Sequence, residues 1–103
     1  MTPARGEVWR YATAINRPGL STARLVVSAA AINRAEQLPV VLALHVVDTD
    51  PGGLLAVGLG EHGWASALSI EPSLRSRLVE RLAVIDPATM DRVDAALRAA
   101  QDL

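Results

Sequence analysis

The chain has 103 residues, which is enough for one modest hydrophobic core, and we expect a single domain over residues 1–103. Half of the residues are hydrophobic, but there is no Phe and there are only two Trp and one Tyr, so the core must consist mainly of Val, Leu, Ile and Ala. Ten basic and eleven acidic residues give a net charge of −1, which excludes a general electrostatic attraction to nucleic acid. Contact with RNA or DNA would need a local patch.

Cysteine usage and hydropathy exclude further classes. The chain has no Cys, and therefore no disulfide framework, thiolate zinc site or thiol nucleophile. No apolar run reaches the ~18 residues of a membrane span, and residues 1–12 lack the pattern of a secretory signal peptide. We therefore expect a cytoplasmic protein that does not interact with a membrane.

Alternating apolar and polar residues predict the first strands. The segment RGEVWRYAT alternates, which indicates an early strand with a mixed surface. Turn residues then predict an exposed connection over residues 15–21, followed by a strand over 23–29. After the polar link INRAEQ, the segment LPVVLALHVV is apolar on both faces, which indicates a central strand with Pro39 at its entrance.

The second half continues as short strands and closes with a helix. DTDPGG at 48–53 predicts a turn, LLAVGL at 54–59 a strand and ASALSIE at 65–71 another. A short turn or helical turn is expected between Pro72 and Glu80, followed by the last strand, RLAVI at 81–85. Asp86 as N-cap and Pro87 at the first helical position predict a terminal helix. Its apolar stripe is Met90, Val93, Leu97 and Ala100, and on its outer face Asp94 is expected to pair with Arg98.

Five or six short strands before one terminal helix predict a mainly β fold, a small antiparallel barrel with the helix packed on it. The opening RGEVW, the strand LVVS, the pair NR at 33–34 and the ending RLVERLAVIDPATMDRVDAAL together resemble the MazF/PemK family of toxins, the mRNA interferases of type II toxin–antitoxin systems. The resemblance implies an SH3-like barrel of the MazF/CcdB type and a homodimer. It also implies cleavage of single-stranded RNA at short sequences without a metal or other cofactor, and inhibition by an antitoxin peptide.

The family's two catalytic positions diverge in this chain. The resemblance implies an arginine at the start of the second strand and a threonine at the end of the third, but the matching positions hold Thr22 and His45. Arg24 lies roughly 7 Å along the same strand face from Thr22, a distance that a long side chain can span. Arginine can stabilise phosphate charge but cannot act as a base, whereas histidine titrates near neutral pH. The catalytic candidates are therefore Arg24, His45 and Thr22.

Structural roles for these residues remain open alternatives. A lone His on an apolar strand is often structural, and an Arg on a strand edge is often solvated or ion-paired; we expect Arg24 to lie outside the core. Asp48 and Asp50 resemble part of a calcium loop but lack the distal Glu, so we expect a turn and no metal site. The candidates for binding RNA or the antitoxin are Asn16, Arg17, Ser28, His62 and Trp64, of which Trp64 can instead be a core plug.

Three functions are consistent with the sequence. The first is an RNA-cleaving toxin, whose antitoxin peptide would cover residues 15–21 and meet Arg17. The second is a catalytically inactive MazF-like module that binds an antitoxin peptide or RNA. The third is a gyrase-targeting toxin like CcdB, which is the weakest because the chain ends in AAQDL and lacks the C-terminal Trp-Gly-Ile of those toxins.

Overall fold

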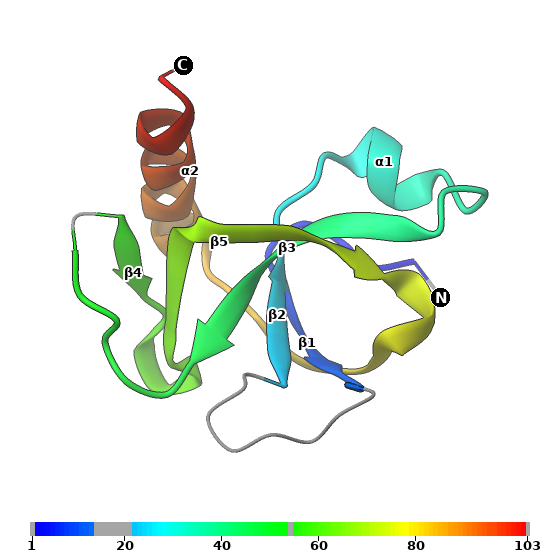
Figure 1. Ribbon diagram of the computed structural model, residues 1–103, viewed down its shortest axis with the longest axis horizontal. Helices are drawn as coiled ribbons and strands as arrows, with labels where there is room; N and C mark the ends of the chain where they lie inside the picture. The colour runs from blue at the N-terminus through cyan, green and yellow to red at the C-terminus, as the bar shows by residue number, and fades with distance from the viewer. Residues whose placement is uncertain (1, 14–21, 54, 103) are drawn as a thin grey trace.

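The computed structural model describes residues 2–13, 22–53 and 55–102, and these residues form one six-stranded antiparallel sheet with two α-helices (Figure 1). The strand order in the sheet is β4-β5-β3-β2-β1-β6. Short 3₁₀ turns occupy Gly60–His62 and Arg75–Arg77. The elements are β1 (Glu7–Tyr11), β2 (Ala23–Val26), α1 (Ala30–Arg34), β3 (Val40–Val47), β4 (Ala56–Gly58), β5 (Trp64–Leu74), β6 (Leu78–Val84) and α2 (Pro87–Gln101).

The prediction of a mainly β fold with a C-terminal helix is confirmed. β3 lies between β2 and β5, as its apolar residues on both faces indicated, and Pro39 directly precedes it. β1 matches the alternating segment at the start of the chain.

Both faces of the sheet bury apolar side chains. Alternation along β1 places Val8 in one cluster and Trp9 in the other. Helix α2 packs against β4 and β5 and contributes Met90 and Val93 to the first cluster (Figure 1). The second cluster, on the opposite face, contains Trp9, Val26, Val41 and Leu78, with Tyr11 packed against it.

Helix α2 begins as predicted but its outer residues differ. The Asp86 carboxylate accepts a hydrogen bond from the Thr89 backbone N–H at 3.1 Å, which confirms the N-cap. Two details were wrong. Ala100 is exposed because the last turn of α2 projects past the sheet (Figure 1), and Ala96 is buried instead. Asp94 forms an ion pair with Arg5, near the N-terminus, and this replaces the expected pair with Arg98.

β2 ends at Val26, three residues before the predicted end of the strand at 29. The polar link INRAEQ predicted after it is also wrong, because residues 30–34 form helix α1. Asn33 anchors the turn through its side-chain amide, which donates to the Ser28 carbonyl at 2.9 Å. Arg75 stabilises the other end of α1: its guanidinium donates to the Asn33 carbonyl at 2.7 Å and the Ile32 carbonyl at 2.6 Å. The last carbonyls of a helix lack the usual N–H partner one turn further on; the Ile32 carbonyl also accepts from the Ala35 N–H at 3.1 Å, and the distant Arg75 adds its hydrogen bonds to this end of α1.

The predicted turn or helical turn between Pro72 and Glu80 is present as the 3₁₀ turn Arg75–Arg77, but it is shorter than that range because β5 continues to Leu74 and β6 begins at Leu78. Pro72 pairs with Leu42 of β3, while β4 pairs only with residues 64–66 of β5. Pro72 has no backbone N–H to donate. Because no described strand lies beside it on the side of β4, the sheet loses no hydrogen bond at this position.

The break between β4 and β5 depends on Gly63. Its φ angle is +101°, and a Cβ there would lie 2.5 Å from the Val47 carbonyl oxygen, so only glycine fits. β4 itself spans Ala56–Gly58, within the predicted strand over 54–59, of which Leu54 lies outside the described residues.

A buried carboxylate anchors the start of β1. Glu7 accepts hydrogen bonds from the Ala4 N–H at 2.7 Å, the Trp9 indole at 3.0 Å and the Arg81 guanidinium at 3.1 Å. Burial alone would raise the pKa of Glu7, but these donors together hold the pKa below its usual value.

This lowered pKa predicts an acid-dependent stability. The contribution of Glu7 is present above the unfolded-state pKa of about 4.3 and is lost as the pH falls through the lower folded-state pKa. We expect Glu7→Gln to be less stable than wild type at pH 7, with the difference shrinking toward pH 3 in urea unfolding. Glu80→Gln, which removes a surface partner of Arg10, should show a much smaller change. If the free energy of unfolding of wild type and of Glu7→Gln changed with pH in the same way, the stabilising role assigned to the ionised Glu7 carboxylate would be contradicted.

Candidate active site

The strand register places Arg24 and His45 side by side. Arg24 on β2 pairs with His45 on β3 and, across its other edge, with Trp9 on β1. Their side chains lie on the face that carries the Trp9 cluster, since they alternate with Leu25 and Leu44 of the other cluster. The two strand-borne catalytic candidates are therefore direct cross-strand neighbours.

A third residue, Glu71 on β5, joins the two. The same carboxylate oxygen, Oε1, lies 2.8 Å from His45 Nε2 and 3.5 Å from Arg24 Nε. The exposed fractions of the side chains are 5% for Arg24, 29% for His45 and 42% for Glu71. In this Arg24–Glu71–His45 cluster, the arginine is innermost, and the carboxylate and imidazole reach the surface.

Arg24 is part of the interior, so the expectation that it lies outside the core is wrong. Its Cζ lies 4.5 Å from the centroid of the Tyr11 ring, and its Nη1 donates to the Ala23 carbonyl at 3.0 Å. Burial lowers the pKa of Arg24, and the nearby Glu71 carboxylate and Tyr11 hydroxyl oppose that shift. The ring and the carboxylate compensate a buried cation that would otherwise be costly.

Glu71 was missed from the sequence, although a signal was present. It is the only charged residue in the segment WASALSIEPSL, which forms β5. A lone carboxylate in an otherwise uncharged strand needs either solvent or a partner. That pattern could have marked Glu71, but its two partners come from other strands and are set by the sheet register.

The other predicted site residues that the structure describes are not members of the Arg24–Glu71–His45 cluster. Thr22 is exposed just before β2, and its carbonyl accepts a hydrogen bond from the Tyr11 N–H. Ser28 is buried, hydrogen-bonds through its hydroxyl to Asn33, and accepts from the Leu42 N–H at 3.2 Å, so we expect a structural role for it. Asn16 and Arg17 lie outside the described residues.

His62 and Trp64 flank the glycine break. His62 is exposed, with Nε2 3.8 Å from Oε1 of Glu61. Trp64 is partly buried and its ring covers Gly58, where a Cβ would lie 3.3 Å from the ring. This contact supports the structural alternative for Trp64, a plug beneath the loop.

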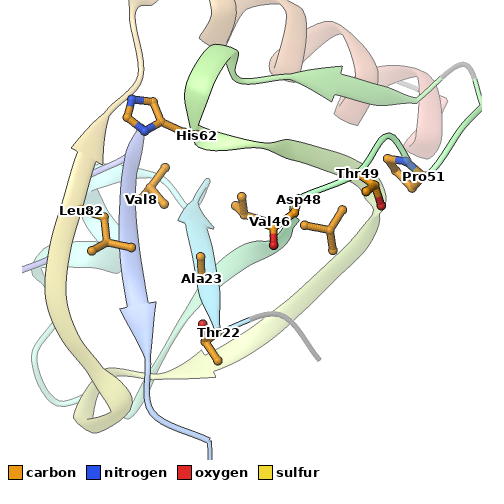
Figure 2. A pocket seen from close by; sticks show the side chains of 10 residues that line it. Val8, Thr22, Ala23, Val46, Asp48, Thr49, Pro51, His62 and Leu82 are labelled. Atoms are coloured by element: carbon orange, nitrogen blue, oxygen red, sulfur yellow. The ribbon is translucent and has the colours of Figure 1, made fainter. Parts of the chain in front are cut away.

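A pocket of about 730 Å³ opens near the ends of β2 and β3 (Figure 2). Ala23 and Val46 form part of its wall, and they are paired on the rung next to Arg24 and His45. Thr22, Asp48 and His62 line it as well.

Within residues 2–13, 22–53 and 55–102 there is no cluster of three or more His, Asp or Glu that could hold a metal ion. In the same ranges, each helix is too short or too polar to cross a membrane.

Comparison with known proteins identifies the fold. No protein-family model matches the sequence, and no curated protein matches it either. Among solved structures, an endoribonuclease from Mycobacterial species is 29% identical with a TM-score of 0.82, covering 100% of this chain and 94% of that chain. An endoribonuclease in complex with its cognate antitoxin, also from Mycobacterial species, is 28% identical with a TM-score of 0.83, covering 98% and 96%. MazF from Deinococcus radiodurans shares the fold at 24% identity and a TM-score of 0.77, covering 100% and 99%.

These likenesses extend over the whole sheet and α2. The fold is the SH3-like antiparallel barrel with a C-terminal helix, as predicted. Over its whole length the chain is similar to two mycobacterial endoribonucleases and shares the fold of MazF, in line with the resemblance drawn from its motifs.

Proposed function

We propose that the chain is the toxin of a toxin–antitoxin pair and cuts single-stranded RNA in the cytoplasm, at selected sequences and without a metal. The similar mycobacterial structures support this class, because one is an endoribonuclease and another is an endoribonuclease bound to its cognate antitoxin. The replacement of both expected catalytic residue types means that a different group must carry the proton transfer in this chain.

The observation that carries the proposal is the contact between His45 Nε2 and Glu71 Oε1 at 2.8 Å. A carboxylate that accepts from one imidazole nitrogen fixes the ring orientation and favours a lone pair on the other nitrogen, Nδ1. His45 is partly exposed, so substrate can approach the ring. The pair therefore has the parts of a general base with its orienting carboxylate.

The reaction that fits this pair is attack by the 2′-oxygen of RNA on the adjacent phosphorus. His45 takes the 2′-hydroxyl proton, the new oxygen–phosphorus bond forms, and the bond to the 5′-oxygen breaks. The resulting imidazolium is stabilised by Glu71 and returns its proton to the leaving 5′-oxygen. The products are a 2′,3′-cyclic phosphate and a 5′-hydroxyl, with no net proton consumed.

Arg24 has a positioning role in this scheme. Its side chain is only 5% exposed and lies behind Glu71, with Tyr11 stacked on it. Direct contact with a phosphate would require it to leave this packing, whereas its Nε already lies 3.5 Å from the Glu71 carboxylate and helps to hold that group in place. The phosphate role predicted for Arg24 is thus replaced by support of the carboxylate.

The proposal is tested by incubating the purified protein with a mixed single-stranded RNA pool in EDTA and sequencing both ends of every fragment. We expect cuts at a restricted set of sequences that leave 2′,3′-cyclic phosphate and 5′-hydroxyl ends. Cleavage that requires added Mg²⁺, or that leaves 5′-phosphate ends, would contradict the 2′-hydroxyl route.

The burial of Arg24 favours a second candidate, an inactive binding module. If Arg24 and Glu71 serve only to stabilise the sheet, the chain would bind an antitoxin peptide or RNA without cutting it. Intact RNA over the whole range from pH 5 to 9, together with retained RNA or antitoxin binding, would favour this candidate.

We also propose that the chain forms a homodimer. Several large apolar side chains are exposed on β5 and β6, among them Leu68 at 75% and Val84 at 65%. Exposed apolar surface of this kind favours association. Light scattering at micromolar concentration should give twice the chain mass of 10.9 kDa. A monomer mass would contradict the proposal.

A further inference from the structure

The residues that line the pocket beside the candidate active site do not include Arg24, Glu71 or His45, so they have no part in the proposed cleavage chemistry. Ala23 and Val46 in its wall point to the sheet face opposite Arg24 and His45, since neighbours along a strand alternate. The pocket also extends around the end of the two strands, where Thr22 precedes β2 and Asp48 follows β3 (Figure 2). A strand of nucleic acid crossing this end of the sheet would contact both places.

The lining favours a ligand that is flat, uncharged and rich in hydrogen-bond donors. Its volume of about 730 Å³ is typical of small-molecule sites. No lining residue is Lys or Arg, and Asp48 supplies a negative charge, so a phosphate group is disfavoured. Hydroxyls of Thr22 and Thr49 and the His62 imidazole provide further polar groups. The remaining lining residues are apolar or proline: Val8, Ala23, Val46, Val47, Pro51 and Leu82.

We propose that this pocket binds one nucleobase of the RNA substrate and that Asp48 makes it selective for guanine. The inference rests on the proposed ribonuclease function. A carboxylate has two acceptor oxygens, and guanine presents two adjacent donors, N1–H and the N2 amino group, on one edge. Adenine, cytosine and uracil do not offer two adjacent donors on that edge, so a carboxylate satisfies them less well.

The arrangement in Figure 2 fits a base held between two sides of the pocket. Asp48, Thr49 and Pro51 lie on one side, and His62 and Leu82 lie on the other. His62 can donate to a carbonyl oxygen such as guanine O6, while Leu82 offers an apolar surface to the base. Asp48 is exposed on a turn, so its substitution is not expected to disturb the fold.

The test measures binding and is independent of cleavage. The probes are two fluorescent uridine dodecamers with 2′-O-methyl sugars, which have no free 2′-hydroxyl to attack the phosphate; one carries a central guanosine and the other a central inosine. Inosine differs from guanosine only in lacking the N2 amino group. We expect wild type to bind the guanosine probe about ten-fold tighter, as is usual for a good base contact.

Asp48→Asn should bind the two probes equally, because it replaces one acceptor oxygen with a donor. The matched control is Asp50→Asn, which removes the same charge from the same turn but does not line the pocket; Asp50 instead accepts from the Gly52 N–H at 2.8 Å. It should keep the ten-fold preference.

Three results would overturn the inference: equal binding of both probes by wild type, an unchanged preference in Asp48→Asn, or no measurable binding of either probe. A preference for guanosine that depends on Asp48, in a protein that leaves RNA uncut, would support the pocket assignment and contradict only the cleavage function.

Discussion

His45→Gln should lower the rate of RNA cleavage by about 10²-fold or more, the usual effect of losing a general acid or base. Glutamine can keep a hydrogen bond to Glu71, which lies 2.8 Å from the imidazole in wild type, but it cannot accept and return a proton. Because His45 is partly exposed at the sheet surface, the variant should fold normally.

The comparison variant is His62→Gln, measured at saturating protein because His62 lines the proposed base pocket and its loss is expected to affect RNA binding rather than the cleavage step. The chain has two histidines, and His62 lies in the turn before β5, outside the Arg24–Glu71–His45 cluster. Cleavage rates are measured in EDTA with enzyme in excess of RNA, after circular dichroism has shown that both variants are folded. A loss in His45→Gln of less than three-fold, or an equal loss in His62→Gln, would contradict the assignment.

Arg24→Met should lower the free energy of unfolding by roughly 2–3 kcal/mol. Removing one partner of a fully buried ion pair costs about 3–5 kcal/mol, and Glu71 keeps 42% of its side chain exposed, so water compensates part of the loss. Methionine retains much of the contact with Tyr11, so the effect reports mainly the missing charge and its hydrogen bonds.

Arg10→Met is the control for this second prediction. Arg10 also lies on a strand and pairs with a glutamate, Glu80, but both side chains are more than half exposed. Its loss should cost about 1 kcal/mol or less in urea unfolding. Adding Glu71→Gln to Arg24→Met should restore part of the stability, because it removes the carboxylate charge that has lost its buried cation and keeps a hydrogen-bond partner for His45. Equal effects of Arg24→Met and Arg10→Met would mean that Arg24 is not a buried structural cation.

Elements fixed by local patterns were predictable from the sequence. β3 follows from a continuous apolar run, and the start of α2 follows from Asp86 and Pro87. Helix α1 was missed because its last carbonyls depend on Arg75, a residue about 40 positions away. The boundary of β5 was misplaced because a proline, which has no backbone N–H, interrupts a strand only where a neighbouring strand needs that hydrogen bond. No described strand lies beside Pro72 on the side of β4, so β5 continues through it.

The candidate site was predictable in part. The family resemblance marked the positions of Thr22 and His45, and strand alternation added Arg24 on the face of Thr22; the sheet register makes Arg24 and His45 direct neighbours. The burial of Arg24 could not be predicted, because it depends on the Tyr11 ring from β1 and the Glu71 carboxylate from β5. These contacts are tertiary and leave no local pattern in the strand that carries Arg24.

The most direct test of the central claim, that His45 carries the proton in RNA cleavage, is the pH dependence of the single-turnover rate in EDTA. The wild-type rate should show a limb that follows one titrating group, because the imidazole must be in one protonation state to act. The residual activity of His45→Gln should lack that limb over the same pH range. The same limb in both proteins would show that another group moves the proton and would contradict the account.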